Sequence, residues 1–513
     1  MVDHKVLITT SGIGSRLGKL TDFTNKSLVR IGDKPAISHI IEYYPEDTSF
    51  VITLGHFGSY VKEFLTLAYP NRKFTFIRVD NFKGQGSSLG YSILQAKNEL
   101  QCPFIFHASD TILTKEDIIP NLEHNWCVGA YKEETSQYRT IRTNNGWVDI
   151  IAEKGEINFD YPYIGLCGIK DYKLFWDKLE ELPKTSSLSD VHVINEMLDT
   201  VTFNFHKINN WLDIGNTTEL NKTREYFGSS IKVLDKSNES IYFFNDFVIK
   251  FFSDEIINKN RIERASMLKG LVPNILNSTQ NFYKYKKAEG DLFAKSVNEN
   301  TFGSFLNWAE NNLWKSKTTD NFNQKCFDFY VVKTSKRINQ YLGGKSDSPG
   351  IINGELIPSI EDILHQIDTE WLCNGVPVQF HGDFILDNVI ETQDDFCLID
   401  WRQDFAGDLE VGDIYYDLAK LYGGCIIPYN IMKQDDSIKF SEGDTIVNYS
   451  YTNLKSLSKF KSTYKNWIIS NGYDLNKIKT LTALIFLNMS PLHDEKFGKM
   501  LWFKCIEILS NVN

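Results

Sequence analysis

Short apolar runs alternate with amphipathic stretches along the first part of the chain. The runs VLITT, FVITL and PFIFHAS are separated by stretches such as PAISHIIEYY, in which apolar residues recur at helical spacing. Strands that alternate with helices predict a mostly parallel sheet covered on both faces. From Lys5 to about Gly215 we therefore expect an α/β domain.

The pattern changes after this region. The segment SIKVLDKSNESIYFFNDFVIKFF contains apolar strands joined by polar turns, which is typical of antiparallel pairing. After Glu263 the chain has a largely helical pattern, interrupted by a strand pair around VQFHGDFILDNVIE and FCLIDW. We expect a first domain at 1–228 and a second at 229–513, the latter with a small lobe at about 229–290 and a large helical lobe at about 291–513.

Composition adds further expectations. A chain of 513 residues exceeds what one hydrophobic core usually supports, which favours more than one domain. A net charge of −11 argues against non-specific nucleic-acid binding, and no run of about 18 apolar residues predicts membrane insertion. The eight cysteines are scattered without a CxxC pair and there is no secretory signal, so we expect reduced thiols and a cytoplasmic protein.

A glycine-rich turn follows the first apolar run. Gly12, Gly14 and Ser15 lead into a basic stretch that contains Arg16 and Lys26. Glycines allow backbone N–H groups to approach phosphate oxygens closely, and the cations offset phosphate charge. The motif alone is equally typical of a tight structural turn.

The surrounding segments make this motif more specific. LITTSGIGSRLGKLTDFTNKSL resembles the signature of the nucleotide-sugar pyrophosphorylase family, and GQGSSLGYSIL, PFIFHASDTIL, YIGLCGIKD and WLDIGNTTEL follow in the family's order. The resemblance covers nearly all of residues 5–225 and implies a Rossmann-like, GT-A-like mixed sheet with helices on both faces. The chain departs from the family at two places. Thr10-Ser11 occupy the position of the family's usual pair of small residues before the glycine, and Asn25 stands where the family generally has proline.

The resemblance also implies a reaction. Asp110 and Asp213 would hold a Mg²⁺ ion on the nucleotide phosphates, although either aspartate alone is more typical of a turn or helix cap. A substrate phosphate would attack the α-phosphorus of a nucleoside triphosphate, with Arg16 bracing the leaving pyrophosphate and Lys26 neutralising charge where the phosphates meet.

The same family places a nucleoside-binding loop before a helix. Here that loop corresponds to Gly86, Ser87 and Ser88, which are also typical of a helix N-cap. A weaker hypothesis assigns three further residues to the acceptor pocket: Glu153, Lys154 and Asp190.

A second motif lies in the C-terminal half. His381-Gly382-Asp383 is followed by Asn388 at the DxxxxN spacing of kinase catalytic loops, and Asp400 ends the strand FCLID. Together with GDIYYDLAKL these residues resemble the choline kinase and aminoglycoside phosphotransferase family, which implies a bilobal kinase-like α+β domain. The resemblance assigns Asp383 as catalytic base and Asn388 and Asp400 as Mg²⁺ ligands.

Further residues of this half fit the same resemblance. Lys250 in FVIKFF and Glu263 in NRIERASMLKGL match the kinase lysine and glutamate pair, although a lysine on a strand more often faces solvent. The chain has no GxGxxG here, so the hairpin LDKSNESIYFF would cover the phosphates. We expect Asp413 and Asp417 to be structural.

The two halves together predict a bifunctional enzyme. A kinase would phosphorylate a small hydroxylated metabolite with ATP, and a nucleotidyltransferase would join the product to CMP or UMP from CTP or UTP, for surface polysaccharide synthesis by analogy. Choline is one candidate acceptor, and Arg402 argues against it because a guanidinium repels a quaternary ammonium. Two alternatives remain. One half could be catalytically silent and sense nucleotides, or the kinase half could phosphorylate an antibiotic and so confer resistance. The partners would be small molecules, and the sequence is compatible with a homo-oligomer.

Overall fold

A computed structural model describes residues 4–156, 159–228, 238–343, 350–393, 395–428, 437–443, 446–452 and 455–512. The chain divides into one unit of residues 1–258 and 276–286 and another of residues 259–275 and 287–513. The predicted domain boundary at residue 228 lies next to residues 229–237, which are outside the described residues. The hairpin that we expect to cover the phosphates begins within that stretch. Both features lie partly outside the described residues and stay predictions.

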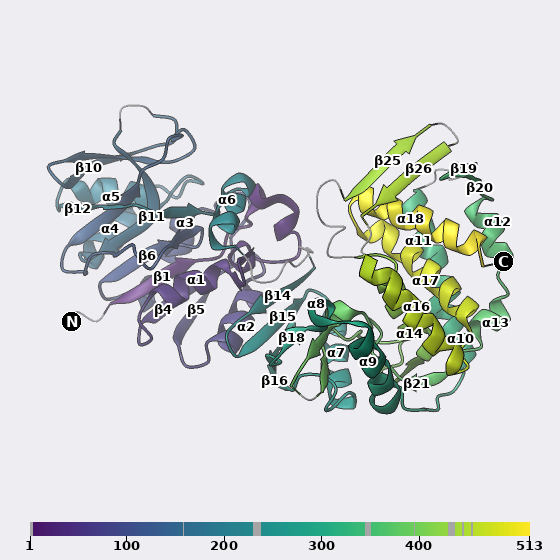
Figure 1. Cartoon of the computed structure of the whole chain (residues 1–513). Helices are drawn as coiled ribbons and strands as arrows, with labels where there is room; N and C mark the ends of the chain where they lie inside the picture. Colours follow the sequence, from purple (N-terminus) through teal and green to yellow (C-terminus); the bar gives the residue numbers. More distant parts are fainter. Residues whose placement is uncertain are drawn as a thin grey trace. The chain divides into compact units, whose positions relative to one another are not determined.

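A nine-stranded mixed sheet forms the centre of the first unit (Figure 1). The neighbouring strands β5, β4, β1 and β6 are parallel to one another, and β11 runs antiparallel to both of its neighbours, β6 and β8. The strand order is β5 (Lys73–Arg78), β4 (Ser49–Leu54), β1 (Lys5–Thr9), β6 (Phe104–Ala108), β11 (Tyr161–Ile169), β8 (Asn125–Ala130), β12 (Phe203–Ile208), β10 (Trp147–Ala152) and β9 (Thr140–Asn144).

Helices cover both faces of this sheet because its strands are apolar on both sides. In β1, Val6 and Ile8 belong to one buried cluster and Leu7 to the other. One cluster includes α1 (Ala36–Tyr43), α2 (Gly58–Ala68) and α6 (Thr217–Phe227), and the other includes α3 (Leu89–Leu94), α4 (Tyr172–Glu181) and α5 (Asp190–Leu198). This is the α/β arrangement that the alternation predicts. Two short hairpins, β2 (Arg30–Ile31) with β3 (Lys34–Pro35) and β7 (Thr111–Leu113) with β13 (Trp211–Asp213), lie outside the main sheet.

The first unit also contains a four-stranded sheet that follows the nine-stranded one in sequence. Its order is β14 (Glu239–Phe243), β15 (Phe247–Phe252), β17 (Phe282–Lys286) and β16 (Ile275–Ser278). Tyr242 and Phe251 pack on α2, with ring centroids 5.3 Å from Phe64 and 5.0 Å from Tyr60. The antiparallel strands were predicted, whereas their incorporation into the core of the first unit was not.

The second unit is mostly helical. Its main helices are α9 (Glu299–Asn312), α10 (Phe322–Phe327), α11 (Lys333–Leu342), α14 (Ile414–Gly424), α16 (Lys455–Ser470), α17 (Leu475–Met489) and α18 (Glu495–Ser510), with short helices α8 (Phe293–Ser296), α12 (Ile360–His365) and α13 (Thr369–Cys373). The helix α7 (Glu255–Met267) begins in the first unit and ends in the second.

Short strands position the second candidate site. The strand pair β22 (Val389–Glu391) and β23 (Phe396–Leu398) confirms the predicted interruption of the helices. The remaining strands are β18 (Asp291–Leu292), β19 (Ile351–Ile352), β20 (Glu355–Leu356), β21 (Pro377–Gln379), β24 (Val411–Asp413), β25 (Ile438–Glu442) and β26 (Ile446–Tyr451). Within the described ranges, no helix is both long and apolar enough to cross a membrane. All eight cysteines are free thiols, as predicted.

Candidate active sites

The glycine loop leaves the carboxyl end of β1 and is held close to Lys26. Gly14 has φ 72°, and a Cβ built on it would lie 2.8 Å from the Cβ of Lys26. Any larger residue would therefore push the lysine away and strain the backbone. Gly12 has open space around its Cβ position, and Ser15 begins a 3-10 helix at Ser15–Thr21.

Asn25 explains one departure from the family signature. Its buried amide donates to the carbonyls of Thr10 and His56 at 2.7 and 2.6 Å, and its oxygen accepts from the Ser27 amide at 2.9 Å. A proline could make none of these side-chain bonds. The asparagine therefore ties the glycine loop to the loop after β4 and orients the turn that carries Lys26.

Lys26 reaches across the edge of the sheet to Asp110. Because β1 and β6 are parallel neighbours, with Thr9 opposite Ala108, the residues that follow them emerge at the same edge. The Lys26 Nζ lies 3.0 Å from Asp110 Oδ2. Burial raises the pKa of Asp110, but Lys26 and then Arg16 outweigh this effect, so the pKa lies below its usual value. The carboxylate is thus ionised.

Asp213 joins this group through the short β7–β13 hairpin. Asp213 is paired with Thr111, and the Ile214 amide donates to the Asp110 carbonyl at 3.1 Å. A Cβ built on Gly215 would lie 3.0 Å from Asp213 Oδ1, 3.5 Å from Arg16 Nη2 and 3.7 Å from Asp110 Oδ2. Burial and the charge of Asp110 raise the pKa of Asp213. Four predicted residues, Arg16, Lys26, Asp110 and Asp213, therefore gather at one place.

Two residues that the sequence analysis missed support Asp213. The Tyr138 hydroxyl donates to Asp213 Oδ2 at 2.7 Å, and Lys132 Nζ donates to that hydroxyl oxygen at 3.0 Å. Lys132 also pairs with Glu219 and lies 4.7 Å from the ring centroid of Trp211. Tyr138 stands in an irregular segment and Lys132 two residues after the end of β8, so no periodicity or motif marked either one.

The predicted nucleoside loop has the geometry of a helix cap. Gly86 has φ 83°, the Ser87 hydroxyl donates to the Gly84 carbonyl at 2.7 Å, and Ser88 Oγ accepts from the Tyr91 amide at 2.9 Å. The structural reading of Ser88 as the N-cap of α3 is therefore confirmed. Nucleotide contacts of Gly86, Ser87 and Ser88 stay predictions.

The candidate acceptor residues have different environments. Asp190 is buried, accepts from the Tyr163 hydroxyl at 2.6 Å, and has a pKa that burial raises. Lys154 has a pKa lowered by burial, then by the charge of Arg16, which places this ammonium near the site. Glu153 forms an ion pair with Arg139 at 3.1 Å. Of the three, Lys154 is the one coupled to the gathered charges.

The second candidate site is built on the loop after β21. Asp417 of α14 accepts hydrogen bonds from the backbone amides of His381 and Gly382 at 2.8 and 2.7 Å. These two bonds anchor the loop to α14. Gly382 has φ 87°, and a Cβ there would lie 2.6 Å from the Cβ of Arg402. Asp413 caps α14 through the Tyr415 amide. The expected structural roles of Asp413 and Asp417 are thus visible in their bonds.

Asp383 is held by two polar neighbours. Lys420 Nζ lies 2.7 Å from Asp383 Oδ1, and the Asn388 side-chain amide donates to Asp383 Oδ2 at 3.2 Å. Burial raises the pKa of Asp383, but the charge of Lys420 and its hydrogen bond outweigh burial and lower it overall. Lys420 was not predicted, because its partner stands 37 positions earlier and no local pattern connects them.

Asp400 lies two residues beyond the end of β23 and directly before Trp401. It has φ 61°, a strained conformation for a residue other than glycine, and its Oδ1 lies 2.6 Å from Arg261 Nη1. The charge of Asp400 raises the pKa of Asp383, so the two carboxylates interact. The loop and Asp400 are thus brought together, as the motif order requires. Arg261 was not predicted.

The remaining predicted pair is divided between the two units. Lys250 is buried in β15 of the first unit, opposite Ile241 and Tyr283. Glu263 stands in the part of α7 that belongs to the second unit and forms an ion pair with Lys259 at 3.7 Å. The Lys250–Glu263 pair stays a prediction.

Both groups have a donor chemistry that fits Mg²⁺, which prefers a few hard oxygen ligands and shares its shell with phosphates and water. In the first group, the Asp110 and Asp213 carboxylates border the same space beside Gly215. In the second group, the Asp400 carboxylate interacts electrostatically with the Asp383 carboxylate, and the Asn388 side chain is hydrogen-bonded to Asp383. These residues would hold the ion.

No protein family profile matches the chain. Over 211 residues it is 27% identical to the choline-phosphate cytidylyltransferase of Streptococcus pneumoniae, which covers 40% of this chain and 84% of that protein. The N-terminal part of the chain resembles nucleotidyltransferases. Over 131 residues it is 27% identical to the bifunctional protein GlmU of Methanococcus vannielii, covering 26% of this chain and 30% of that protein.

Solved structures of similar proteins include two cytidylyl-transferring enzymes. The CTP:phosphocholine cytidylyltransferase of Streptococcus pneumoniae is 18% identical with a TM-score of 0.39, covering 44% of this chain and 100% of its own. The inositol-1-phosphate CTP transferase of T. maritima is 16% identical with a TM-score of 0.38, covering 44% of this chain and 96% of its own. A UDP-glucose pyrophosphorylase from Acinetobacter baumannii is also 16% identical, with a TM-score of 0.37, covering 44% of this chain and 94% of its own.

Proposed function

We propose that the first unit transfers a nucleoside monophosphate from CTP or UTP to a phosphorylated small molecule and releases pyrophosphate. The observation that carries this proposal is the gathering of Arg16, Lys26, Asp110 and Asp213 at one edge of the sheet. Two cations and two carboxylates that share one space suit a reaction between two phosphates. The similarity to a choline-phosphate cytidylyltransferase favours CTP over UTP.

In this reaction an oxygen of the acceptor phosphate forms a bond to the α-phosphorus, and the bond from that phosphorus to the bridging oxygen of the β-phosphate breaks. No enzyme nucleophile is needed, because alignment and charge stabilisation suffice. Arg16 binds the leaving pyrophosphate, and Lys26 stabilises charge between the reacting groups. A bound Mg²⁺ would supply further charge neutralisation at Asp110 and Asp213.

We also propose that the second unit is a small-molecule kinase that uses ATP. Asp383 would accept a hydrogen bond from the acceptor hydroxyl and orient its oxygen toward the γ-phosphorus, while Asn388 and Asp400 would hold Mg²⁺. The hydroxyl oxygen forms the new bond, the γ-phosphoryl group leaves ADP, and the hydroxyl proton passes to Asp383. Because Lys420 keeps the pKa of Asp383 low, Asp383 acts chiefly by orienting the hydroxyl.

The surroundings of the kinase loop favour an acceptor without a quaternary ammonium. Arg402 and Lys333 lie over the ring of Phe329, at 4.9 and 4.2 Å from its centroid. Burial, followed by the charge of Arg402, lowers the pKa of Lys333 well below its usual value. Two cations already occupy this aromatic ring, so a sugar, a polyol or an anionic hydroxy compound fits better than choline.

Acting in sequence, the two units would produce an activated building block for a surface polysaccharide. The similarity to a choline-phosphate cytidylyltransferase supports a second candidate, in which choline is phosphorylated and then joined to CMP. A third candidate is that one half only senses nucleotides. It is disfavoured because carboxylates suited to metal binding, together with the candidate base or lysine, are present in both halves.

The test is an assay of the full chain with ATP, Mg²⁺ and CTP or UTP. Choline, ethanolamine, glycerol, amino acids and hexoses are supplied free or phosphorylated, and pyrophosphate release is followed. The proposal expects a free acceptor to give pyrophosphate only with ATP present, and Asp383→Asn to abolish that signal while sparing the phosphorylated acceptor. If pyrophosphate came only from phosphorylated acceptors, and no ATP were consumed with any free acceptor, the kinase assignment of the second unit would be rejected.

A further inference from the structure

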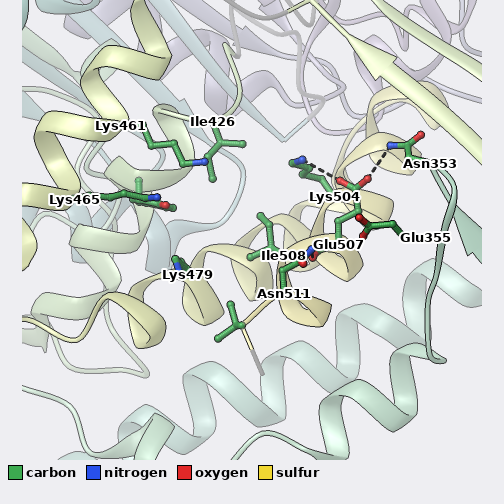
Figure 2. A pocket seen from close by; sticks show the side chains of 12 residues that line it. Asn353, Glu355, Ile426, Lys461, Lys465, Lys479, Lys504, Glu507, Ile508 and Asn511 are labelled. Carbon is green, nitrogen blue, oxygen red and sulfur yellow. Dashed lines mark hydrogen bonds and ion pairs between the residues drawn. The ribbon is translucent and has the colours of Figure 1, made fainter.

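A pocket of about 380 Å³ lies among the C-terminal helices of the second unit. Four lysines line it: Lys461 and Lys465 from successive turns of α16, Lys479 from α17 and Lys504 from α18. Figure 2 shows Lys461 and Lys465 on one side of the space, opposite Lys504 and Glu507. None of the residues predicted for either active site lines this pocket.

The positive charge of the pocket is only partly compensated. Glu507 accepts from Lys504 at 2.9 Å, from Asn353 at 2.8 Å and from the Tyr449 hydroxyl at 2.6 Å, so this carboxylate is fully engaged (Figure 2). Glu355, the other carboxylate of the lining, is exposed. Across the described ranges, neither Lys461 nor Lys465 forms an ion pair with a carboxylate. Two of the four lysines of the pocket, Lys461 and Lys465, thus have no ion-pair partner among the described residues.

The lysines affect one another. Burial lowers the pKa of Lys461, and the charges of Lys465, Lys504 and Lys479 lower it further. Bringing like charges together in a half-buried space costs free energy unless an anion joins them. These four lysines come from three helices and line one cavity.

Apolar side chains also line the pocket. They are Tyr422 of α14, Ile426 two residues beyond that helix, and Ile508 of α18. The Lys461 Nζ lies 5.7 Å from the Tyr422 ring centroid, so cationic and apolar groups lie close together in the lining. A volume of this size suits a ligand as large as a nucleotide, with its phosphates on the lysines and its base on the apolar side chains.

We propose that this pocket binds an organic polyphosphate, of the class that includes nucleoside triphosphates, at a site separate from both active sites. Lysines bind phosphate as point charges, and several of them around one cavity select for ligands with more than one negative charge. The proposal does not depend on the reactions assigned to the two active sites.

The test measures lysine acylation in the full chain by mass spectrometry, residue by residue. Inorganic tripolyphosphate, ATP and CTP are the probes, each compared with sulfate at equal ionic strength. At a probe concentration about ten times Kd we expect acylation of Lys461 and Lys465 to fall on the order of ten-fold. Lys496, an exposed lysine of α18 outside the pocket, is the internal control and should not change.

A paired variant separates the pocket from the active sites, because ATP and CTP are also expected there. Lys461→Gln/Lys465→Gln should weaken tripolyphosphate binding, measured by calorimetry, at least ten-fold, whereas Lys496→Gln should leave it unchanged. Circular dichroism checks the fold of each variant. Equal protection by sulfate, or unchanged acylation of Lys461 and Lys465 with all three probes, would overturn the proposal.

Discussion

The Nζ of Lys26 lies 3.0 Å from Oδ2 of Asp110, although the two residues are 84 positions apart in the chain. Their meeting depends on the parallel pairing of β1 with β6 and on Gly14, which leaves room for the lysine. In the absence of substrate the lysine neutralises the aspartate. In the proposed reaction a triphosphate and its cation would compete for both groups, so the pair is suited to exchanging partners.

Replacing Lys26 tests the role of its charge. We expect Lys26→Gln to lower kcat for pyrophosphate release about 10²- to 10³-fold, because a donor that stabilises charge in the transition state is lost. The measurement is a steady-state pyrophosphate assay with a phosphorylated acceptor. Lys19→Gln is the control, since Lys19 is exposed in the same segment, and equal activity of the two variants would contradict the assignment.

Gly215 offers a second test that leaves every charged group in place. In Gly215→Ala the new methyl group would lie 3.0 Å from Asp213 Oδ1 and would enter the space that Asp110 and Arg16 border. We expect a raised Mg²⁺ requirement and loss of pyrophosphate release, on the order of ten-fold or more, with the fold retained. Gly303→Ala is the matched control, because no atom lies within 4 Å of the Cβ position there. A Mg²⁺ titration that superimposes for Gly215→Ala and the unchanged protein would argue against a metal at this place.

Sequence analysis identified those site residues that belong to a series of motifs in a known order. Gly14, Lys26, Asp110 and Asp213 were found because their segments follow one another in a known order, and the structure brings them together. Tyr138 was missed because it stands in an irregular segment, where neither periodicity nor spacing indicates which side chain turns inward.

Long-range partners explain the other omissions. Lys420 and Arg261 pair with Asp383 and Asp400 from helices whose patterns indicate only amphipathic faces. Similarly, the strands β14 and β15 were predictable from apolar alternation. Their packing on α2 was not, because alternation shows which face is apolar and not which element covers it.

The Lys420–Asp383 ion pair predicts a shift in the pH profile of the proposed kinase reaction. The charge of Lys420 opposes burial and holds the pKa of Asp383 below its usual value. In Lys420→Gln this charge is lost, so the pKa of Asp383 rises and the acidic limb of kcat against pH moves to higher pH. The profile is measured with an acceptor from the panel, and pyrophosphate release from a phosphorylated acceptor should keep its own profile. An unshifted acidic limb would show that Asp383 does not set it.

His381 predicts how acid affects stability. Its Nδ1 accepts from the Asp383 amide at 3.3 Å, its Nε2 lies 3.0 Å from the Ile399 carbonyl, and burial lowers its pKa from 6.5 to about 4. Below pH 6.5 the unfolded chain takes up a proton that the native chain does not, so stability falls until about pH 4. The loss amounts to about 3 kcal/mol.

The measurement is urea unfolding of the full chain between pH 7 and pH 4. Because His381→Gln removes this titration, we expect its unfolding midpoint to fall less on acidification than that of the unchanged protein. The side chain of His365 is 79% exposed, so His365→Gln should follow the unchanged protein. If His381→Gln retained the full acid sensitivity, another group would be responsible, with His107 the first to examine, since its pKa is also lowered to about 4 by burial.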